Sequence, residues 1–114
     1  MAQILIVEDE ANIRRVLRKI LIDADKNINI SEAADGVEAI SMVDDKTYDL
    51  VLCDIKMPKK DGIEVLEHIQ KVSPQTAVVM ISGHGDLETA VKAMRMGAYD
   101  YISKPPDLDN LLQT

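Results

Sequence analysis

Short apolar runs that alternate with helical patterns constrain this chain of 114 residues most strongly. The runs at residues 3–7, 50–53 and 77–81 are too short for helices and almost uniformly hydrophobic. Such runs are typical of strands buried on both faces of a parallel sheet. Between them, as at residues 12–23, apolar side chains recur with helical spacing. The alternation predicts an α/β fold, a doubly wound five-stranded parallel sheet in the flavodoxin-like order 2-1-3-4-5.

Two further strands complete the predicted sheet. Residues 27–33 alternate between apolar and polar side chains, as expected for a strand at the edge of a sheet. Residues 99–103 predict the fifth strand, and residues 107–114 have the pattern of a last helix that is truncated. We therefore expect one domain, residues 1–114, which would be the N-terminal fragment of a longer protein.

Turn and capping residues delimit the predicted helices. Asp35 and Gly36 predict a turn before the second helix, and Asp61 or Gly62 opens the third. Gly97 follows the fourth helical pattern, where a glycine commonly ends a helix. These signals place the second, third and fourth helices between strands, as the α/β interpretation requires.

Composition argues against several classes of function. The net charge of −7 argues against direct binding of nucleic acid. No apolar run approaches the ~20 residues needed to cross a membrane, and no basic stretch precedes the first strand to suggest a secretory signal. The single cysteine, Cys53, excludes an internal disulfide and fits a reducing cytoplasm, where we expect the protein to be located.

Polar side chains follow the predicted strands at the points where the strands end. Glu8 and Asp9 follow the first strand, and Asp54 follows the third. Ser82 follows the fourth strand and Lys104 the fifth. Because the carboxyl ends of parallel strands meet at one edge of the sheet, we expect these side chains to gather there.

The acids at this edge suit a magnesium site beside a nucleophile. In the predicted order, Asp9 and Asp54 lie on neighbouring strands ~4.8 Å apart, where their carboxylates repel unless a cation lies between them. Mg²⁺ prefers such oxygen ligands, whereas the acids are wrong for a structural zinc site. We interpret Asp54 as a nucleophile that accepts a phosphoryl group, with Lys104 as a point charge beside it.

Four motifs resemble the receiver domain of two-component response regulators. They are VEDE at residues 7–10, CDIKMPKKDG at 53–62, ISGHG at 81–85 and YISKP at 101–105. The resemblance covers essentially the whole chain, and the motifs have the order and spacing of that family. Residues 83–105 further resemble the receivers of NtrC-type transcriptional activators.

The resemblance implies a signalling switch controlled by phosphorylation. Asp54 would accept a phosphoryl group from the phosphohistidine of a sensor histidine kinase. The implied cofactor is Mg²⁺, and its implied ligands are Asp9, Asp54, the backbone carbonyl of Lys56 and, through water, Glu8. The domain would promote its own phosphotransfer and autodephosphorylation, and would not be an enzyme with an external substrate.

The resemblance also assigns the residues that sense and transmit the modification. Lys104 would pair with the phosphoryl oxygens, and Ser82 would donate a hydrogen bond to one of them. Tyr101 matches the aromatic switch residue, which moves inward as the Ser82 hydroxyl shifts. The change would reach the face formed by the fourth helix, fifth strand and fifth helix, a surface that could also form a homodimer. The expected output is an ATPase and DNA-binding region, absent from this chain, that controls transcription.

Some implied features concern the loops. Lys56 and His84 occupy the variable positions that tune dephosphorylation, and the Lys104–Pro105 bond would be cis. Pro106 departs from the family, since many relatives have a bulky residue there.

Simpler interpretations account for other residues, and two rival functions stay open. Cys53 would be a small core residue, His68 an exposed helix residue, and Glu10 a solvated acid that complements a helix dipole. One rival is an aspartyl-phosphate phosphohydrolase, although Asp54 lacks the second aspartate two residues later that such enzymes carry. The other is a degenerate receiver that only binds proteins, against which the intact set of acids, serine and lysine argues.

Overall fold

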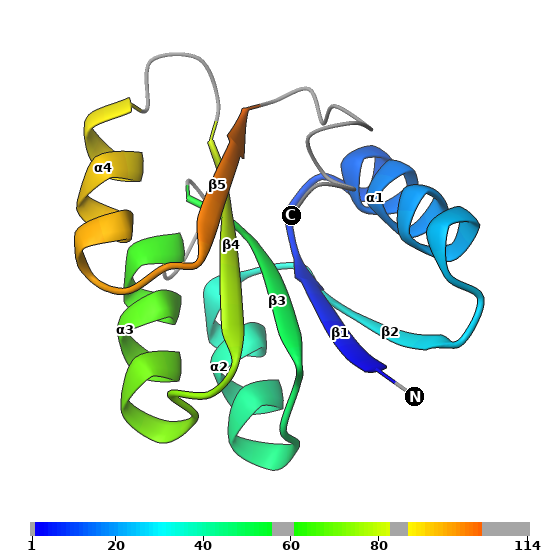
Figure 1. Ribbon diagram of the computed structural model, residues 1–114, viewed down its shortest axis with the longest axis horizontal. Helices are drawn as coiled ribbons and strands as arrows, with labels where there is room; N and C mark the ends of the chain where they lie inside the picture. Colours follow the sequence, from blue (N-terminus) through cyan, green and yellow to red (C-terminus); the bar gives the residue numbers. More distant parts are fainter. Residues whose placement is uncertain (1, 56–60, 83–86, 104–114) are drawn as a thin grey trace.

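The computed structural model describes residues 2–55, 61–82 and 87–103, and these form a parallel sheet flanked by helices (Figure 1). In chain order the elements are β1 (Ala2–Val7), α1 (Ala11–Ala24), β2 (Ile28–Ala33), α2 (Gly36–Asp45), β3 (Leu50–Asp54), α3 (Gly62–Val72), β4 (Ala77–Ser82), α4 (Leu87–Arg95) and β5 (Asp100–Ser103). The sheet has five parallel strands in the order β2-β1-β3-β4-β5, which confirms the predicted fold. No helix in these described ranges is long and apolar enough to cross a membrane.

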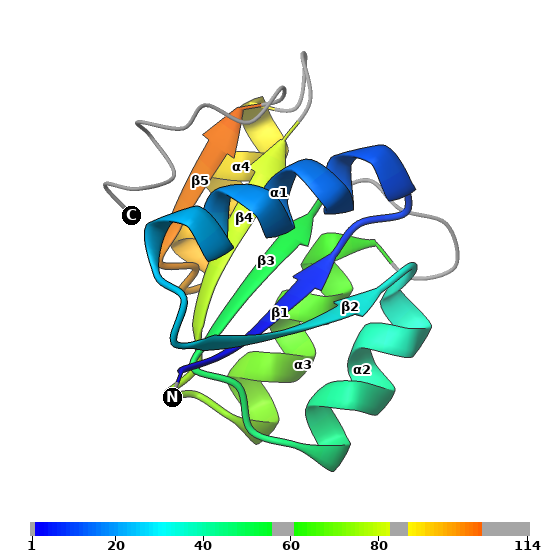
Figure 2. The same cartoon turned by 90° about the vertical axis from the view of Figure 1, so that its right-hand side faces the viewer.

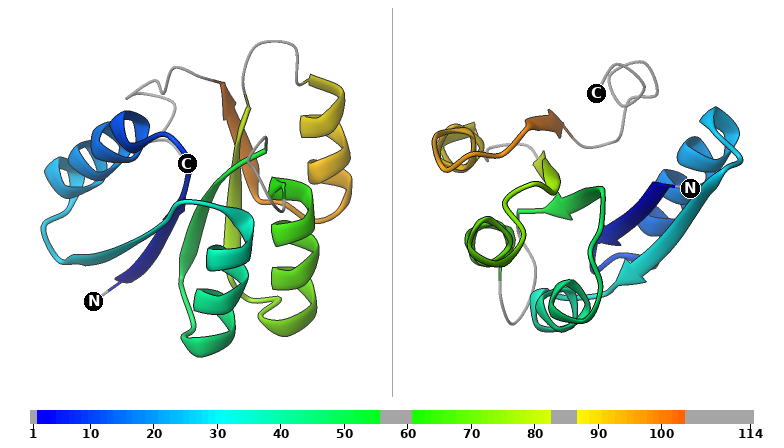
Figure 3. Two further views of the ribbon diagram at one scale, coloured as in Figure 1. Left: turned by 180° about the vertical axis from the view of Figure 1, so that it is seen from behind. Right: turned by 60° about the horizontal axis from the view of Figure 1, so that its bottom comes forward.

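Helices cover both faces of the sheet, and the views from behind and from below separate the two layers (Figure 3). Helix α1 lies on one face, and α2, α3 and α4 lie on the other. The strand residues alternate accordingly. Leu5 and Val51 belong to the hydrophobic cluster under α2, α3 and α4, whereas Ile6 and Leu52 belong to the cluster that includes Leu17 of α1. Each central strand is therefore apolar throughout because both of its faces are buried.

The strand register aligns the carboxyl ends of the central strands at one edge of the sheet (Figure 2). Val7 of β1 pairs with Cys53 of β3, and Asp54 pairs with Ile81 of β4. Strand β3 extends one residue beyond the predicted segment, through Asp54, because the ladder of backbone hydrogen bonds continues whatever the side-chain polarity. The predicted last helix, residues 107–114, lies outside the described residues.

Two aspartates begin helices as N-caps. The Asp61 carboxylate accepts a hydrogen bond from the backbone N–H of Glu64, whose side chain accepts one from the Asp61 N–H in return, which completes a capping box. Asp35, expected only in a turn, caps α2 by accepting from the backbone N–H of Glu38 at 2.8 Å. Capping satisfies N–H groups that have no partner within the helix.

Gly97 ends α4, as the sequence predicts, with a left-handed backbone angle φ of 107°. Its carbonyl accepts a hydrogen bond from Nε2 of Gln70 at 2.9 Å, so a side chain of α3 ties down the turn between α4 and β5. A Cβ atom at position 97 would lie 2.9 Å from the same Nε2 atom. Both the angle and the contact favour glycine here.

We expect Gly97→Ala to lower the free energy of unfolding by about 1–3 kcal/mol, since alanine tolerates this backbone angle poorly. Urea denaturation followed by circular dichroism measures the change. A Gln70→Ala background is the control, because it removes the side chain that an added Cβ would meet. The loss should persist there. If it vanished, the contact with Gln70 would be the cause instead of the backbone angle.

Candidate functional site

Two acidic residues are buried where β1 and β3 end. Asp54 is the last residue of β3 and is 2% exposed. Glu8 follows β1 directly and is fully buried, and its N–H donates to the carbonyl of Ala33 at the end of β2. Val7 of β1 pairs with Cys53 of β3, and Glu8 and Asp54 are the residues that follow this pair in the two neighbouring segments. The register therefore places two acids that are far apart in the sequence at the same end of the sheet.

Glu8, Asp9 and Glu10 form an acidic turn between β1 and α1. One carboxylate oxygen from each lies within 4.8 Å of the others, the sole such group of three or more potential metal ligands among the residues that the structure describes. Glu8 is buried, whereas Asp9 and Glu10 are exposed. Oxygen donors at this density are the ligands that Mg²⁺ prefers, so the turn fits such an ion.

Glu10 contributes more than the helix-start role expected from the sequence. It is the N-cap residue of α1, where its carbonyl accepts from the N–H groups of Ile13 and Arg14 at 3.1 Å each. Its own N–H donates to Oε1 of Glu8 at 3.2 Å. Its carboxylate also belongs to the acidic turn. Three consecutive acids were the only sequence signal for this grouping.

Gly62 lets α3 begin against the backbone of the strand that carries Asp54. The Gly62 N–H donates to the carbonyl of Ile55 at 2.7 Å. A Cβ atom at position 62 would lie 2.8 Å from Cα of Ile55 and would collide with the carbonyl oxygen of Asp54. The sequence shows Gly62 only as a possible helix start, because the close approach is a tertiary contact. Glycine here allows α3 to begin this close to the backbone of Asp54.

Cys53 is a core residue beside the acids, as expected. It is fully buried, and Sγ lies 3.5 Å from the carbonyl oxygen of Asp54. Burial raises the pKa of the thiol well above its usual range, and the negative charges of Asp54, Glu8 and Asp61 raise it further. The sulfur is therefore a protonated thiol at neutral pH and a poor nucleophile.

The remaining predicted site residues are described only in part. Ser82 is the last residue of β4, opposite Ser103 in the register. Tyr101 lies on β5 opposite Met80, and is 37% exposed. The other predicted residues lie outside the described part of the chain, and they are Lys56, His84, Lys104 and Pro105.

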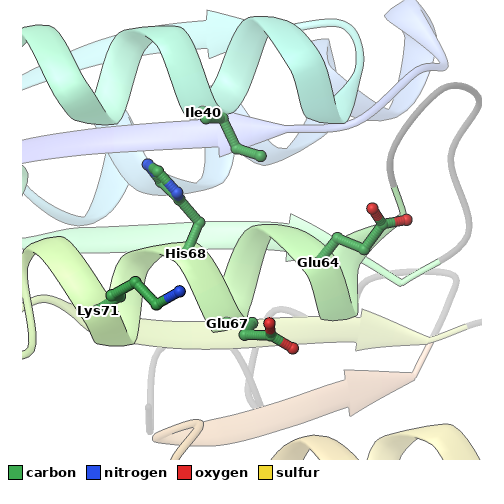
Figure 4. Close-up of a pocket in the computed structure, with 5 residues that line it drawn as sticks. All are labelled: Ile40, Glu64, Glu67, His68 and Lys71. Atoms are coloured by element: carbon green, nitrogen blue, oxygen red, sulfur yellow. The ribbon is translucent and has the colours of Figure 1, made fainter.

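A groove between α2 and α3 holds a second group of polar side chains (Figure 4). Its lining residues are Ile40, Glu64, Glu67, His68 and Lys71. His68 points from α3 toward α2, and its Nε2 atom lies 2.6 Å from Oδ1 of Asp44. His68 is therefore partly buried, and the expectation of an exposed helix residue was wrong. The pair joins two helices and lies apart from the acidic turn.

Comparison with known proteins identifies the family. The family described as the response regulator receiver domain matches residues 4–114. The chain belongs to this family. Among solved structures, the receiver domain of NtrX from Brucella abortus has a TM-score of 0.88 at 42% identity, and the match covers 96% of this chain and 92% of that one. A receiver domain protein from Clostridium thermocellum has a TM-score of 0.89 at 33% identity, covering 97% and 88%.

Longer relatives are named as response regulators or regulatory proteins, in agreement with the sequence resemblance. An NtrX-like response regulator of Rickettsia bellii is 41% identical over 98% of this chain and 23% of its own length. The regulatory protein AtoC of Escherichia coli is 40% identical over 96% of this chain and 23% of its own. The transcriptional regulatory protein ZraR of E. coli is 37% identical, with 97% and 25% covered. This receiver domain thus spans about a quarter of the length of these relatives.

We expect Gly62→Ala to lower the free energy of unfolding by about 1–3 kcal/mol, because a methyl group would be forced into the packed β3 backbone. It should also shift the amide resonance of Asp54. Urea denaturation and amide NMR spectra measure the two effects. The control is Asp61→Ala, which loses the cap of the same helix, about 1 kcal/mol, and adds no atom against β3. An unchanged Asp54 resonance in Gly62→Ala would contradict the close approach.

The raised pKa of the buried Cys53 thiol predicts that the free energy of unfolding falls at alkaline pH. An unfolded cysteine ionises near pH ~8.5, while folded Cys53 stays protonated, so the unfolded state binds fewer protons and stability falls as pH rises above that value. We expect this decline between about pH 8 and 9.5, below the pKa of tyrosine and lysine. Urea denaturation across the range measures it, and Cys53→Ala should remove that part of the slope. Equal slopes in both chains would contradict the raised pKa.

Proposed function

We propose that this receiver domain is a signalling switch operated by phosphorylation of Asp54. The observation that carries the proposal is the burial of Asp54 at the end of a central strand, next to the acidic turn that begins at Glu8. Open α/β sheets bind ligands beyond the carboxyl ends of their strands, where the winding direction reverses. In this sheet the reversal lies between β1 and β3. The chain first leads from β1 to β2 at one edge of the sheet, and then returns past β1 to β3 on the other side.

The reaction transfers a phosphoryl group from a histidine of a sensor kinase to Asp54. A carboxylate oxygen of Asp54 attacks the phosphorus atom, a P–O bond forms, and the P–N bond of the phosphohistidine breaks. The electron pair of that bond leaves with the imidazole nitrogen, which takes up a proton. Phosphoryl transfer depends mainly on positioning and charge neutralisation, and the rigid end of β3 provides the positioning.

Mg²⁺ is the cofactor that we propose for this site. Its ligands would be Asp9, Asp54 and the backbone carbonyl of Lys56, with Glu8 acting through water. When bound, the ion supplies positive charge that offsets the charge on the transferring oxygens. Asp9 is exposed and Glu8 is buried, which supports direct binding of the ion by Asp9 and binding through water by Glu8. An exposed carboxylate can reach an ion that arrives from solvent.

We propose that Ser82, Lys104 and Tyr101 convert the added charge into a change of surface. Lys104 would pair with the phosphoryl oxygens, Ser82 would donate a hydrogen bond to one, and Tyr101 would move inward. Lys56 and His84 would tune autodephosphorylation. The position of Tyr101 on the edge strand β5 supports a surface role. Added phosphate charge biases a two-state element by this kind of local rearrangement.

The face of α4 and β5 is the proposed contact surface for an output region or a second copy. It exposes several large apolar side chains, which are Val91, Met94, Tyr99 and Tyr101. Exposed apolar groups that cluster on one face favour contact with another protein. By analogy with the longer relatives, the output would be control of transcription, and we propose a cytoplasmic location for the switch.

We expect Asp54→Asn to abolish phosphorylation by acetyl phosphate and Mg²⁺, because an amide cannot act as the nucleophile. Intact-mass spectrometry of the folded chain should show addition of one phosphoryl group to the unsubstituted protein and none to the variant. Asp45→Asn is the matched control, since Asp45 is exposed at the end of α2 and should leave labelling intact. Labelling of Asp54→Asn at full stoichiometry would place the phosphoacceptor elsewhere.

A further inference from the structure

Arg14 of α1 binds the backbone of the acidic turn. Its Nη1 atom donates a hydrogen bond to the carbonyl oxygen of Glu8 at 2.6 Å. Its Nε atom donates to Oε1 of Glu32 on β2 at 3.2 Å. The Arg14 side chain is only 19% exposed, so both bonds are partly shielded from water. One guanidinium group therefore links the helix, the end of β1 and the neighbouring strand.

Glu32 holds the guanidinium group in this orientation. Oε2 of Glu32 accepts a second hydrogen bond, from Nη1 of Arg18 at 2.7 Å, while Oε1 faces Arg14. Arg14 and Arg18 lie one helical turn apart on α1, so a single carboxylate receives both. The planar guanidinium has its donors in a rigid fork, so anchoring Nε to Glu32 directs Nη1 at the Glu8 carbonyl.

These contacts fix the shape of the acidic turn from its first residue. The N–H of Glu8 is bonded to Ala33, its carbonyl to Arg14, and its Oε1 atom to the N–H of Glu10. Three carboxylates within 4.8 Å repel one another, and this repulsion favours opening of the turn. A guanidinium group bound to the backbone opposes that opening and leaves the carboxylates available.

We propose that Arg14 is a positioning residue for cation binding, which preorganises the acidic turn through the Glu8 carbonyl without touching the ion. The proposal rests on the proposed function only in that the turn binds Mg²⁺. Residues that orient metal ligands typically contribute about 10–100-fold to affinity. A preorganised turn also avoids part of the free energy needed to bring the acids together.

The test measures Mg²⁺ binding by titration calorimetry, and Mn²⁺ binding by electron paramagnetic resonance, without any phosphoryl donor. We expect Arg14→Ala to weaken binding about tenfold. Arg14→Lys keeps the charge but lacks the fork, and should recover only part of the affinity. Arg18→Ala is the matched control, because it removes a partner of the same Glu32 one turn farther from the acidic turn. Its affinity should stay close to that of the unsubstituted chain.

A second measurement separates positioning from a general loss of structure. The initial rate of labelling by acetyl phosphate is followed as a function of Mg²⁺ concentration. For Arg14→Lys and Arg14→Ala, the Mg²⁺ concentration at half-maximal rate should rise while the rate at saturating Mg²⁺ is preserved. If Arg14→Ala unfolds, the lysine variant alone decides the result.

Unchanged Mg²⁺ affinity in a folded Arg14 variant would overturn the inference, as would an equal loss in Arg18→Ala. A chain that binds no Mg²⁺ would overturn it too. Failure of the proposed function has a different signature: tight, Arg14-dependent Mg²⁺ binding without any phosphoryl label on Asp54. The two hypotheses can therefore fail separately.

Discussion

The pairing of β1 with β3 is the constraint on which the candidate site depends. These strands are distant in sequence, yet their register places Val7 opposite Cys53 and brings Glu8 and Asp54 to the same end of the sheet. The register is fixed because alternate residues of each strand enter different hydrophobic clusters on the two faces. A slip of one residue would exchange those faces and move the acids relative to each other.

The buried acids are supported from both layers of helices. On the α1 side, Arg14 binds the carbonyl of Glu8 and is itself held by Glu32. On the α3 side, Gly62 allows the helix to begin in contact with the backbone of Asp54 and Ile55. Burying a carboxylate is unfavourable unless hydrogen bonds or cations compensate the charge. The compensating groups must be held in place, so such a site requires well-ordered backbone around the acids. Under the proposed function, the same rigidity would hold the Asp54 carboxylate in position for attack.

The α4 and β5 region differs in character from this rigid edge. Its surface exposes apolar side chains, and among the described strands β5 pairs only with β4, at the edge of the sheet. The bond between Gln70 and Gly97 ties the far end of α4 to α3. The inner face of α4 packs into the core through Ala90 and Ala93, which are fully buried. In the proposed function, the chemistry at Asp54 and the contact surface at α4 and β5 would therefore lie on different strands.

The sequence by itself determined the fold and the candidate acids. Uniformly apolar runs identified the buried strands, alternation identified the edge strand, and acids at strand ends identified Glu8, Asp9 and Asp54, because these signals are local and periodic. Only the tertiary structure showed that Glu8 and Asp54 are the buried acids and that Arg14 is the arginine of α1 that contacts the turn. It also showed why a side chain cannot be accommodated at Gly62. The burial of the acids and the close approach at Gly62 depend on packing between separate elements, and the orientation of Arg14 depends on Glu32 of β2. No local pattern in the sequence shows these contacts.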